Sequence, residues 1–246
     1  MDQALSPALK PRDGCGPTAQ PTPHIVAKAT VRDAIVALGA GYGFLLEPVE
    51  WRVAEYLRYE HLYAVGGHDG KSYLSTVECF DASTNVWSRV ASMSTAREGH
   101  GVTVLGGLLY AVGGHDGKSY LSTGVCFDPS TNVWSPVASM ATARQGPGVT
   151  VLGGLLYAVG GYDGKSYLST VECFDPSTNV WSPVASMATP RNGPGVTVLG
   201  GLLYAVGGYD GTSILSTVEC FDPSTNMWSP VSSMALKRRF CGVATV

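Results

Sequence analysis

The sequence predicts an all-β propeller built from four repeats of 47 residues. Three observations predict it: a segment that returns almost unchanged, Gly-Gly pairs at constant spacing, and four strand-like runs in every repeat. Val159–Ala205 repeats Val112–Ala158 with five changes. The same spacing of 47 residues separates four tryptophans: Trp87, Trp134, Trp181 and Trp228. A period of this length indicates an array of supersecondary units that bury their apolar faces against one another.

Each repeat contains two apolar runs that predict a tight hairpin. In one copy, residues 148–152 (GVTVL) and 155–159 (LLYAV) flank the pair Gly153–Gly154. Two glycines suit this position because the turn of such a hairpin demands positive φ angles. We expect these runs to be the first two strands of a blade.

Two further runs complete the unit. Residues 170–175 (TVECFD) alternate in polarity, which is typical of a strand, and Pro176 begins a turn that leads to residues 180–184 (VWSPV). Pro183 lacks an N–H group for a strand ladder, which favours an edge strand. Four short antiparallel strands with a proline on the outermost one are typical of a propeller blade.

Several motifs resemble the Kelch repeat, and in particular the BTB–Kelch branch. They are "LYAVGG", "DG.S.LSTVE.FDP.TN.W", "SMATPR", the fourth-strand tryptophan, and a tyrosine three residues before each Gly-Gly pair: Tyr63, Tyr110, Tyr157 and Tyr204. The resemblance covers about three quarters of the chain. It implies a noncatalytic module that binds proteins or peptides. It also implies a context of substrate recognition for a cullin-3 ubiquitin ligase, or of actin association.

The repeats are expected at about 61–107, 108–154, 155–201 and 202–246, after an N-terminal extension of residues 1–60. Met1–Pro23 lack apolar periodicity, which predicts disorder. Short helices are predicted at Thr30–Leu38 and Glu47–Glu60, where capping residues adjoin apolar positions. No leader-like segment is recognisable at the start of the chain.

The first repeat lacks its first strand, and the C-terminal segment supplies a candidate replacement. Gly242–Val246 aligns with the first strand of the other repeats. Pairing it with Leu62–Val65 would close the ring and remove two exposed sheet edges. Kelch domains usually have five to seven blades, so an open arc stays as the alternative to a closed four-bladed ring.

Composition excludes some classes of partner. Charged residues make up 14% of the chain and the formal net charge is −3. This balance gives no electrostatic case for nucleic acid or an anionic membrane. One cysteine per repeat occupies the third strand, without a metal-binding spacing: Cys79, Cys126, Cys173 and Cys220. We expect free thiols in a reducing compartment, and therefore a cytoplasmic monomer.

Catalytic and metal-binding patterns are weak, and we expect no cofactor. His68 and His115 follow the first two Gly-Gly pairs, where Tyr162 and Tyr209 follow the last two. A metal site at these loops is the minority hypothesis, although one Kelch-containing copper oxidase uses His, Tyr and Cys ligands. Each aspartate of the Asp-Gly pairs is expected to shape a turn rather than act as an acid. A propeller enzyme, metal-assisted or lyase-like, and a duplicated or designed scaffold with no evolved ligand remain the alternative interpretations.

The loops after the second strand and before the first strand are expected on one face, because successive strands reverse direction. We expect this face to bind a protein or peptide, with an acidic one suited to the arginines. Its candidate residues recur at equivalent positions: Arg97, Arg144, Arg191, Arg238, His68, His115, Tyr162, Tyr209, Tyr73, Tyr120 and Tyr167.

The arginines leave two roles open, recognition and scaffold. As scaffold residues they would bond loop carbonyls or pair with Glu78, Glu172 and Glu219. Val125 stands at the glutamate position of the second repeat, which nevertheless keeps Arg144, and this argues against pairing as the only reason. Related proteins that bind acidic degrons carry further arginines two residues beyond this position. The corresponding residues here are Gly99, Gly146, Gly193 and Phe240, so that specificity does not transfer.

Overall fold

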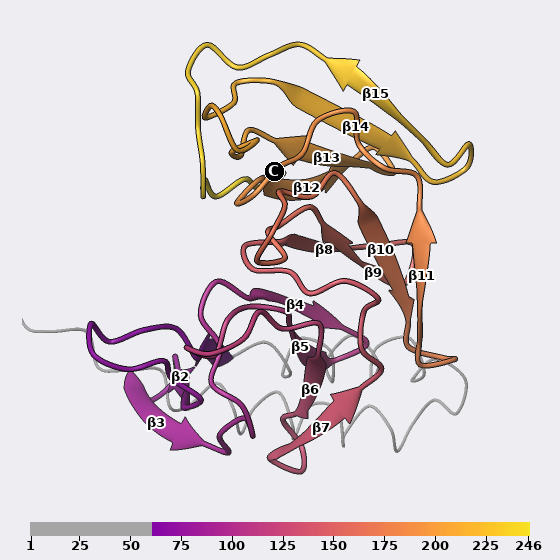
Figure 1. The fold of residues 1–246 in the computed structure, drawn as a ribbon. Coiled ribbons are helices and arrows are strands. Elements are labelled where there is room, and N and C mark those ends of the chain that lie inside the picture. Colours follow the sequence, from indigo (N-terminus) through magenta and orange to yellow (C-terminus); the bar gives the residue numbers. More distant parts are fainter. Residues whose placement is uncertain (1–60) are drawn as a thin grey trace, which may run out of the picture. The chain divides into compact units, whose positions relative to one another are not determined.

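The computed structural model describes residues 61–246, which fold into antiparallel β-sheets that follow one another along the chain (Figure 1). The first sheet has three strands: β1 (His61–Val65), β2 (Val77–Asp81) and β3 (Val86–Val90). Each of the other three has four strands in chain order. The second contains β4 (Gly101–Leu105), β5 (Leu108–Val112), β6 (Gly124–Asp128) and β7 (Val133–Val137). The third contains β8 (Gly148–Leu152), β9 (Leu155–Val159), β10 (Val171–Asp175) and β11 (Val180–Val184). The fourth contains β12 (Gly195–Leu199), β13 (Leu202–Val206), β14 (Val218–Asp222) and β15 (Met227–Val231).

The all-β fold and the strands expected for each repeat are confirmed. In the third sheet, Gly148 pairs with Val159 and Leu152 with Leu155, so the hairpin closes around two glycines as predicted. Gly153 and Gly154 have φ angles of +59° and +79°, which residues with a Cβ rarely adopt. The predicted helices and the disordered segment lie outside the described residues.

Each of the last three sheets begins one strand before the repeat boundary expected from the sequence. The second sheet starts with β4 at Gly101, whereas the expected boundary lies at residue 108. The reason is that the first apolar run pairs with the run directly after it, across the Gly-Gly turn. A blade therefore consists of the strand before the turn and the three strands after it.

Glycines allow the first strands of neighbouring sheets to approach closely. A Cβ atom added to Gly101 would overlap the side chain of Val149, and one added to Gly148 would overlap that of Val196. These glycines begin β4 and β8, which lie next to β8 and β12 respectively. The absence of a side chain at these positions sets the spacing between successive blades.

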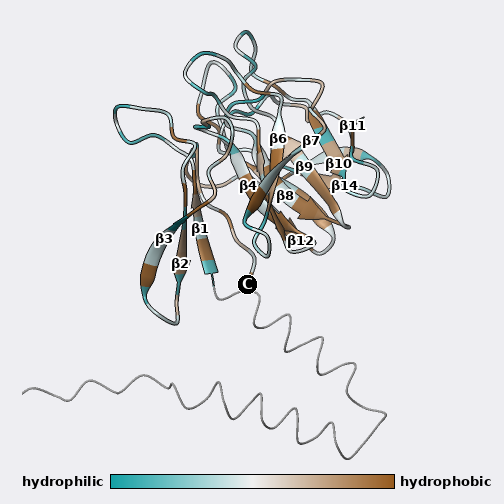
Figure 2. Ribbon diagram, turned by 90° about the horizontal axis from the view of Figure 1, so that it is seen from below, coloured by the Kyte–Doolittle hydropathy of each residue, from teal (hydrophilic) through white to brown (hydrophobic). Residues whose placement is uncertain are grey.

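Aromatic residues fill the space between successive sheets. Tyr110 meets Phe174 with ring centroids 6.0 Å apart, and Tyr157 meets Phe221 at 5.9 Å. Trp181 uses its indole N–H to donate a 2.9 Å hydrogen bond to the Ala138 carbonyl of the preceding blade. Figure 2 shows the strands as mainly apolar and many connecting loops as polar. The core of the array is therefore a series of equivalent interfaces between blades.

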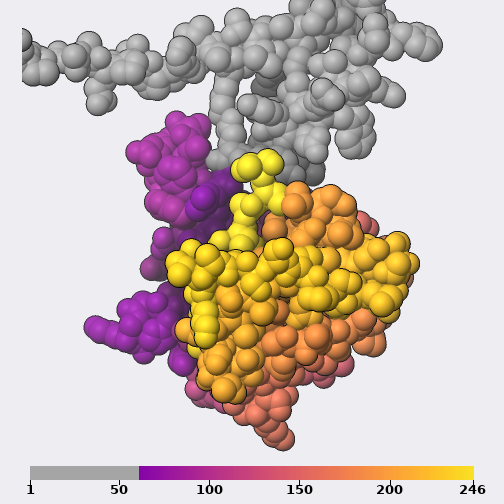
Figure 3. Space-filling model, turned by 90° about the horizontal axis from the view of Figure 1, so that it is seen from above, coloured from indigo at the N-terminus to yellow at the C-terminus, as the bar shows by residue number. Residues whose placement is uncertain are grey.

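The C-terminal segment does not form the strand that was expected to close the ring. Within residues 61–246, β1 pairs only with β2, and no strand is assigned to 242–246. Instead, Val243 lies against Gly195, as Val196 lies against Gly148 one repeat earlier. The segment thus follows the spacing between blades and stays beside β12 (Figure 1). Figure 3 shows the fourth sheet in orange and yellow, with the yellow C-terminal end of the chain projecting from it.

Candidate functional site: the loop face

The two sets of loops that were expected on one face do meet there. The backbone N–H of Gly114 donates to the Arg144 carbonyl at 2.7 Å, which joins a loop after a second strand to a loop before a first strand. His115 and Glu98 exchange backbone hydrogen bonds of 2.9 Å in both directions. Equivalent bonds recur between later blades, so the backbone holds this face, the loop face, rigidly.

Aspartates shape the long loops from within. The side chain of Asp163 accepts backbone N–H bonds from Lys165 and Ser166, each 2.7 Å long. These bonds hold the pKa of the Asp163 carboxyl below its usual range. The equivalent carboxylates of the other repeats do the same. Their role as turn residues is confirmed by this geometry.

Seven rings form a continuous row along the loop face, here called the aromatic row: His68, Tyr73, His115, Tyr120, Tyr162, Tyr167 and Tyr209. Neighbouring rings lie between 4.7 and 5.4 Å apart, centroid to centroid. Contacts within a blade alternate with contacts between blades. All seven belong to the candidate residues expected from the sequence.

Two features of the loop position each ring. Within a blade, the residue after the Gly-Gly pair forms an antiparallel bridge to the residue five positions later, as Tyr162 does to Tyr167. Between blades, the second ring lies over the glycine of the next Asp-Gly pair. A Cβ added to Gly164 would come within 2.7 Å of the Tyr120 ring. Glycine in the Asp-Gly pair is therefore needed for the turn and for the tyrosine of the neighbouring blade.

The row is accessible to solvent and ends in a cation. His68 and Tyr120 are exposed and the other five rings are half-buried. At the far end, the Arg239 guanidinium lies 5.1 Å from the Tyr209 ring centroid and 4.6 Å from that of Phe240. Sequence reasoning missed Arg239 because no other repeat has an arginine at its position.

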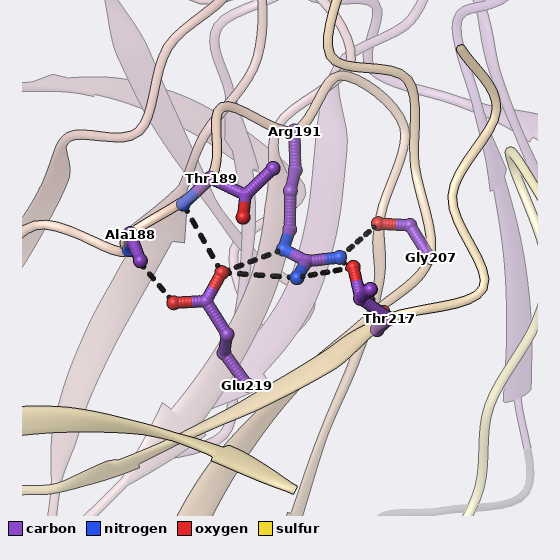
Figure 4. Close-up of polar contacts among 6 residues, drawn as sticks. All are labelled: Ala188, Thr189, Arg191, Gly207, Thr217 and Glu219. Carbon is purple, nitrogen blue, oxygen red and sulfur yellow. Dashed lines mark hydrogen bonds and ion pairs between the residues drawn. The ribbon is translucent and has the colours of Figure 1, made fainter. Parts of the chain in front are cut away.

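Three of the repeated arginines are buried in the interfaces between blades, and Figure 4 shows the contacts of one of them, Arg191. Arg191 donates from Nη1 to the Gly207 carbonyl at 2.7 Å and from Nη2 to Thr217 Oγ1 at 3.0 Å. Its Nη2 also pairs with Glu219 Oε1 at 2.9 Å. Arg144 makes the same set with Gly160, Thr170 and Glu172.

Three of the four arginines are therefore scaffold residues. Arg97, Arg144 and Arg191 are at most 1% exposed, and their bonds go to the loops and to the next blade. Their expected place on a partner-binding surface is wrong, because a guanidinium buried in this way is out of reach of a docked protein. Burial lowers the pKa of Arg144 from its usual value, while its pairing with Glu172 raises it. Arg238 is exposed and stays a candidate.

The sequence argument about Val125 also needs correction. Arg144 and Arg191 each pair with the glutamate 28 residues later, in the following blade, so the partner of Arg144 is Glu172. Val125 occupies the same position relative to Arg97, 28 residues later and opposite a proline, so the presence of Arg144 in the second repeat is no argument against pairing. Glu78, in the first sheet, is exposed.

The remaining candidates take structural positions in the described part of the chain. Cys79 is buried and the cysteines of the later repeats are partly buried, all as free thiols. Within residues 61–246, no group of three or more His, Cys, Asp or Glu side chains is placed to hold a metal ion. The same range has no helix with the length and apolar character needed to cross a membrane.

A family of known proteins matches the chain at each of its four repeats. The family described as "Kelch motif" matches residues 59–94, 96–141, 143–188 and 190–235, which together exceed half of the chain. The chain belongs to the Kelch family. The last three matches begin in the loops before β4, β8 and β12, and each contains all four strands of one sheet.

Individual relatives agree with this assignment. The human protein "Kelch-like protein 4" is 48% identical over 46 residues, which are 19% of this chain and 6% of that protein's length. The solved structure "Structure of YjhT" superimposes with a TM-score of 0.66 at 18% identity, over 75% of this chain and 71% of the other. At that identity the second likeness concerns the fold alone. Kelch repeats are commonly protein–protein interaction modules.

Proposed function

We propose that this Kelch domain binds a protein or peptide segment along the aromatic row, without catalysing a reaction. The observation that carries the proposal is the unbroken contact of seven rings across all four sheets. Tyrosine dominates protein-binding hot spots because it offers a large, rigid, partly polar contact area. The loops that carry the rings are held by backbone bonds, so binding orders little backbone and loses little entropy.

The charges around the row favour an acidic segment. Lys71, Lys118 and Lys165 are exposed at equivalent positions of the first three loops, and Arg239 ends the row. The neighbouring Asp-Gly aspartates are partly engaged, since one oxygen of each accepts two backbone amides of its own loop. A carboxylate of the bound segment would find free ammonium groups beside the rings.

The wider context is part of the same proposal. The resemblance to BTB–Kelch proteins supports a role in substrate recognition for a cullin-3 ubiquitin ligase, with actin association as the second candidate. Free thiols at Cys79 and the equivalent positions support a reducing, cytoplasmic location and a monomer without disulfide links.

Selection from a peptide display library followed by affinity measurement would test the proposal. The decisive variant is Tyr120→Ala with Tyr167→Ala, which removes two rings of the row. The control is Val133→Ala with Val180→Ala, which removes two exposed apolar side chains from the outer strands, away from the row. Each lost hot-spot tyrosine is expected to weaken binding about tenfold or more.

The results separate the alternatives directly. Selected peptides should bind the tyrosine variant at least about tenfold more weakly and the valine variant as well as the parent. Peptides that keep full affinity for the tyrosine variant, or lose it with the valine variant, would place the binding surface elsewhere. Circular dichroism melting of both variants confirms that the fold is retained.

A further inference from the structure

The interface between the first and second sheets lacks a group that the next two interfaces contain. Glu172 and Glu219 occupy the second position of the third strand in their sheets, opposite Pro183 and Pro230. In the second sheet the equivalent position, opposite Pro136, is Val125. An apolar side chain therefore stands where the other interfaces have a buried carboxylate.

The complete interface shows what that carboxylate does. The Glu172 side chain accepts the backbone N–H of Ala141 at 2.7 Å and that of Thr142 at 3.3 Å. It also accepts the 2.9 Å bond from Nη2 of Arg144. Three converging donors thus hold one carboxylate in a buried position. The Glu219 carboxylate is held by the equivalent three groups.

The donors persist where the carboxylate is missing. Arg97 donates from Nη1 to the carbonyls of Gly113 and Thr123, both at 2.8 Å, and from Nη2 to Thr123 Oγ1 at 2.9 Å. These are the same bonds that orient Arg144 at the next interface. The backbone amides of Ser94 and Thr95 lie at the positions equivalent to those that donate to Glu172.

The electrostatics of this interface are unbalanced. Arg97 is 1% exposed, and within residues 61–246 no carboxylate lies within ion-pair distance of its guanidinium. In the described part of the chain, the Nε atoms of Arg97 and Arg144 both lack a hydrogen-bond partner. The missing carboxylate at Nη2 is therefore what distinguishes Arg97 from Arg144. Burial lowers the pKa of Arg97 to about 10, against an opposing influence of Asp116. A buried charge without a partner is costly, so an anion here would be stabilising.

Val125 is also shorter than the glutamate that occupies its position in the next two interfaces. A valine side chain ends at Cγ, one atom before the position of a glutamate carboxyl carbon, so it does not fill the carboxylate position. Ser94, whose amide is one of these donors, is itself exposed to solvent. We infer that the amides of Ser94 and Thr95 and the guanidinium of Arg97 form a binding site for a small carboxylate, at the position that Glu172 fills in the next interface.

Formate is the probe that tests this site, because it is a carboxylate with no further heavy atom. Sodium formate is titrated at constant ionic strength, balanced with a bulky sulfonate salt. Amide chemical shifts in 15N-labelled protein report the site, and thermal unfolding reports its energy. The shifts of Ser94 and Thr95 should saturate, while those of Ala141 and Thr142, which already hold Glu172, should stay unchanged. At about five times Kd, one site raises Tm of a domain of this size by roughly 2–4 °C.

Two variants extend the test, one by filling the site and the other by creating an equivalent site at the next interface. Val125→Glu supplies the missing carboxylate and should abolish both the shifts and the formate-dependent rise in Tm. Glu172→Val vacates the second interface and should create a second saturable response, at Ala141 and Thr142. A second arm replaces formate with acetylated, amidated aspartate. Binding of formate alone assigns the site to a free small anion, and binding of both admits an acidic side chain of a peptide.

The outcomes decide the proposal. A Tm rise of equal size in the parent and both variants would show a general salt effect and overturn the site. Unchanged Ser94 and Thr95 shifts in the parent would overturn it as well. This comparison with Ala141 and Thr142 within the parent remains decisive even where a variant fails to fold.

Discussion

His100 is predicted to make the stability of this domain depend on pH in a way that its sister repeats do not. The position holds proline in the next two repeats, at Pro147 and Pro194. The imidazole is packed beside Gly66, and within residues 61–246 neither nitrogen makes a well-formed hydrogen bond, although the Val65 and Arg97 backbone lies close enough to oppose the lowering of its pKa. Burial, followed by the nearby charge of Arg97, lowers the pKa of His100 to about 4.

The sign and size of the effect follow from this shift. The folded state binds the proton less readily than the unfolded chain, whose histidine has its ordinary pKa of about 6.5. Stability is therefore complete above pH 6.5 and is lost as the pH falls from 6.5 towards 4. At pH 5 the loss from His100 is on the order of 2 kcal/mol.

Urea unfolding of the parent and of His100→Pro at pH 8 and pH 5 measures this contribution. The variant restores the residue of the sister repeats, and Gly99 before it already has the φ of +60° that Gly146 shows at +64°. The protonation of carboxylates in this pH range affects the stability of both proteins equally, so it cancels in the difference between them. The parent should lose about 2 kcal/mol more than the variant between the two pH values. Equal losses would refute the reasoning, because they would mean that the imidazole is protonated in the folded state as easily as in the unfolded chain.

Two further substitutions test the interfaces between blades. Gly148→Ala should lower Tm, at a cost of about 1–3 kcal/mol, because its Cβ would overlap Val196. Gly242→Ala, at the equivalent place in the C-terminal segment where nothing lies within 4 Å, should leave Tm unchanged; a similar fall in both would contradict the packing argument. Trp181→Phe should cost about 1 kcal/mol in urea unfolding through the lost bond to the Ala138 carbonyl, and an unchanged midpoint would show that water replaces that bond.

The strands could be predicted from the sequence because their signals are local. Alternating polarity, the Gly-Gly turn and Pro183 act within a few residues, and the hairpin around Gly153 appears in the expected register. The rings of the aromatic row were also expected on the loop face, since strand reversal alone brings both loop sets together. Their mutual contact was not predicted, because it depends on the spacing between blades.

Other features depend on the relation between repeats, which the pattern of one repeat does not contain. The partner of Arg144 is Glu172, in the following blade, and aligning the repeats suggested the glutamate of the same repeat instead. The position of the C-terminal segment also depends on the relation between repeats. Sequence matching aligned Gly242–Val246 with a first strand, but the rotation accumulated over the sheets decides whether such a segment reaches β1.

The hairpins around the Gly-Gly turns have a consequence for folding. Three first strands have the same sequence, GVTVL, and three second strands read LLYAV, so side-chain complementarity cannot select which first strand joins which second strand. The two-residue turn makes that choice, because it brings one partner into register before any other can arrive. Longer turns would let strands of different blades exchange, and would also favour exchange between molecules. The glycine pairs thus protect a chain of nearly identical units from assembling in the wrong order.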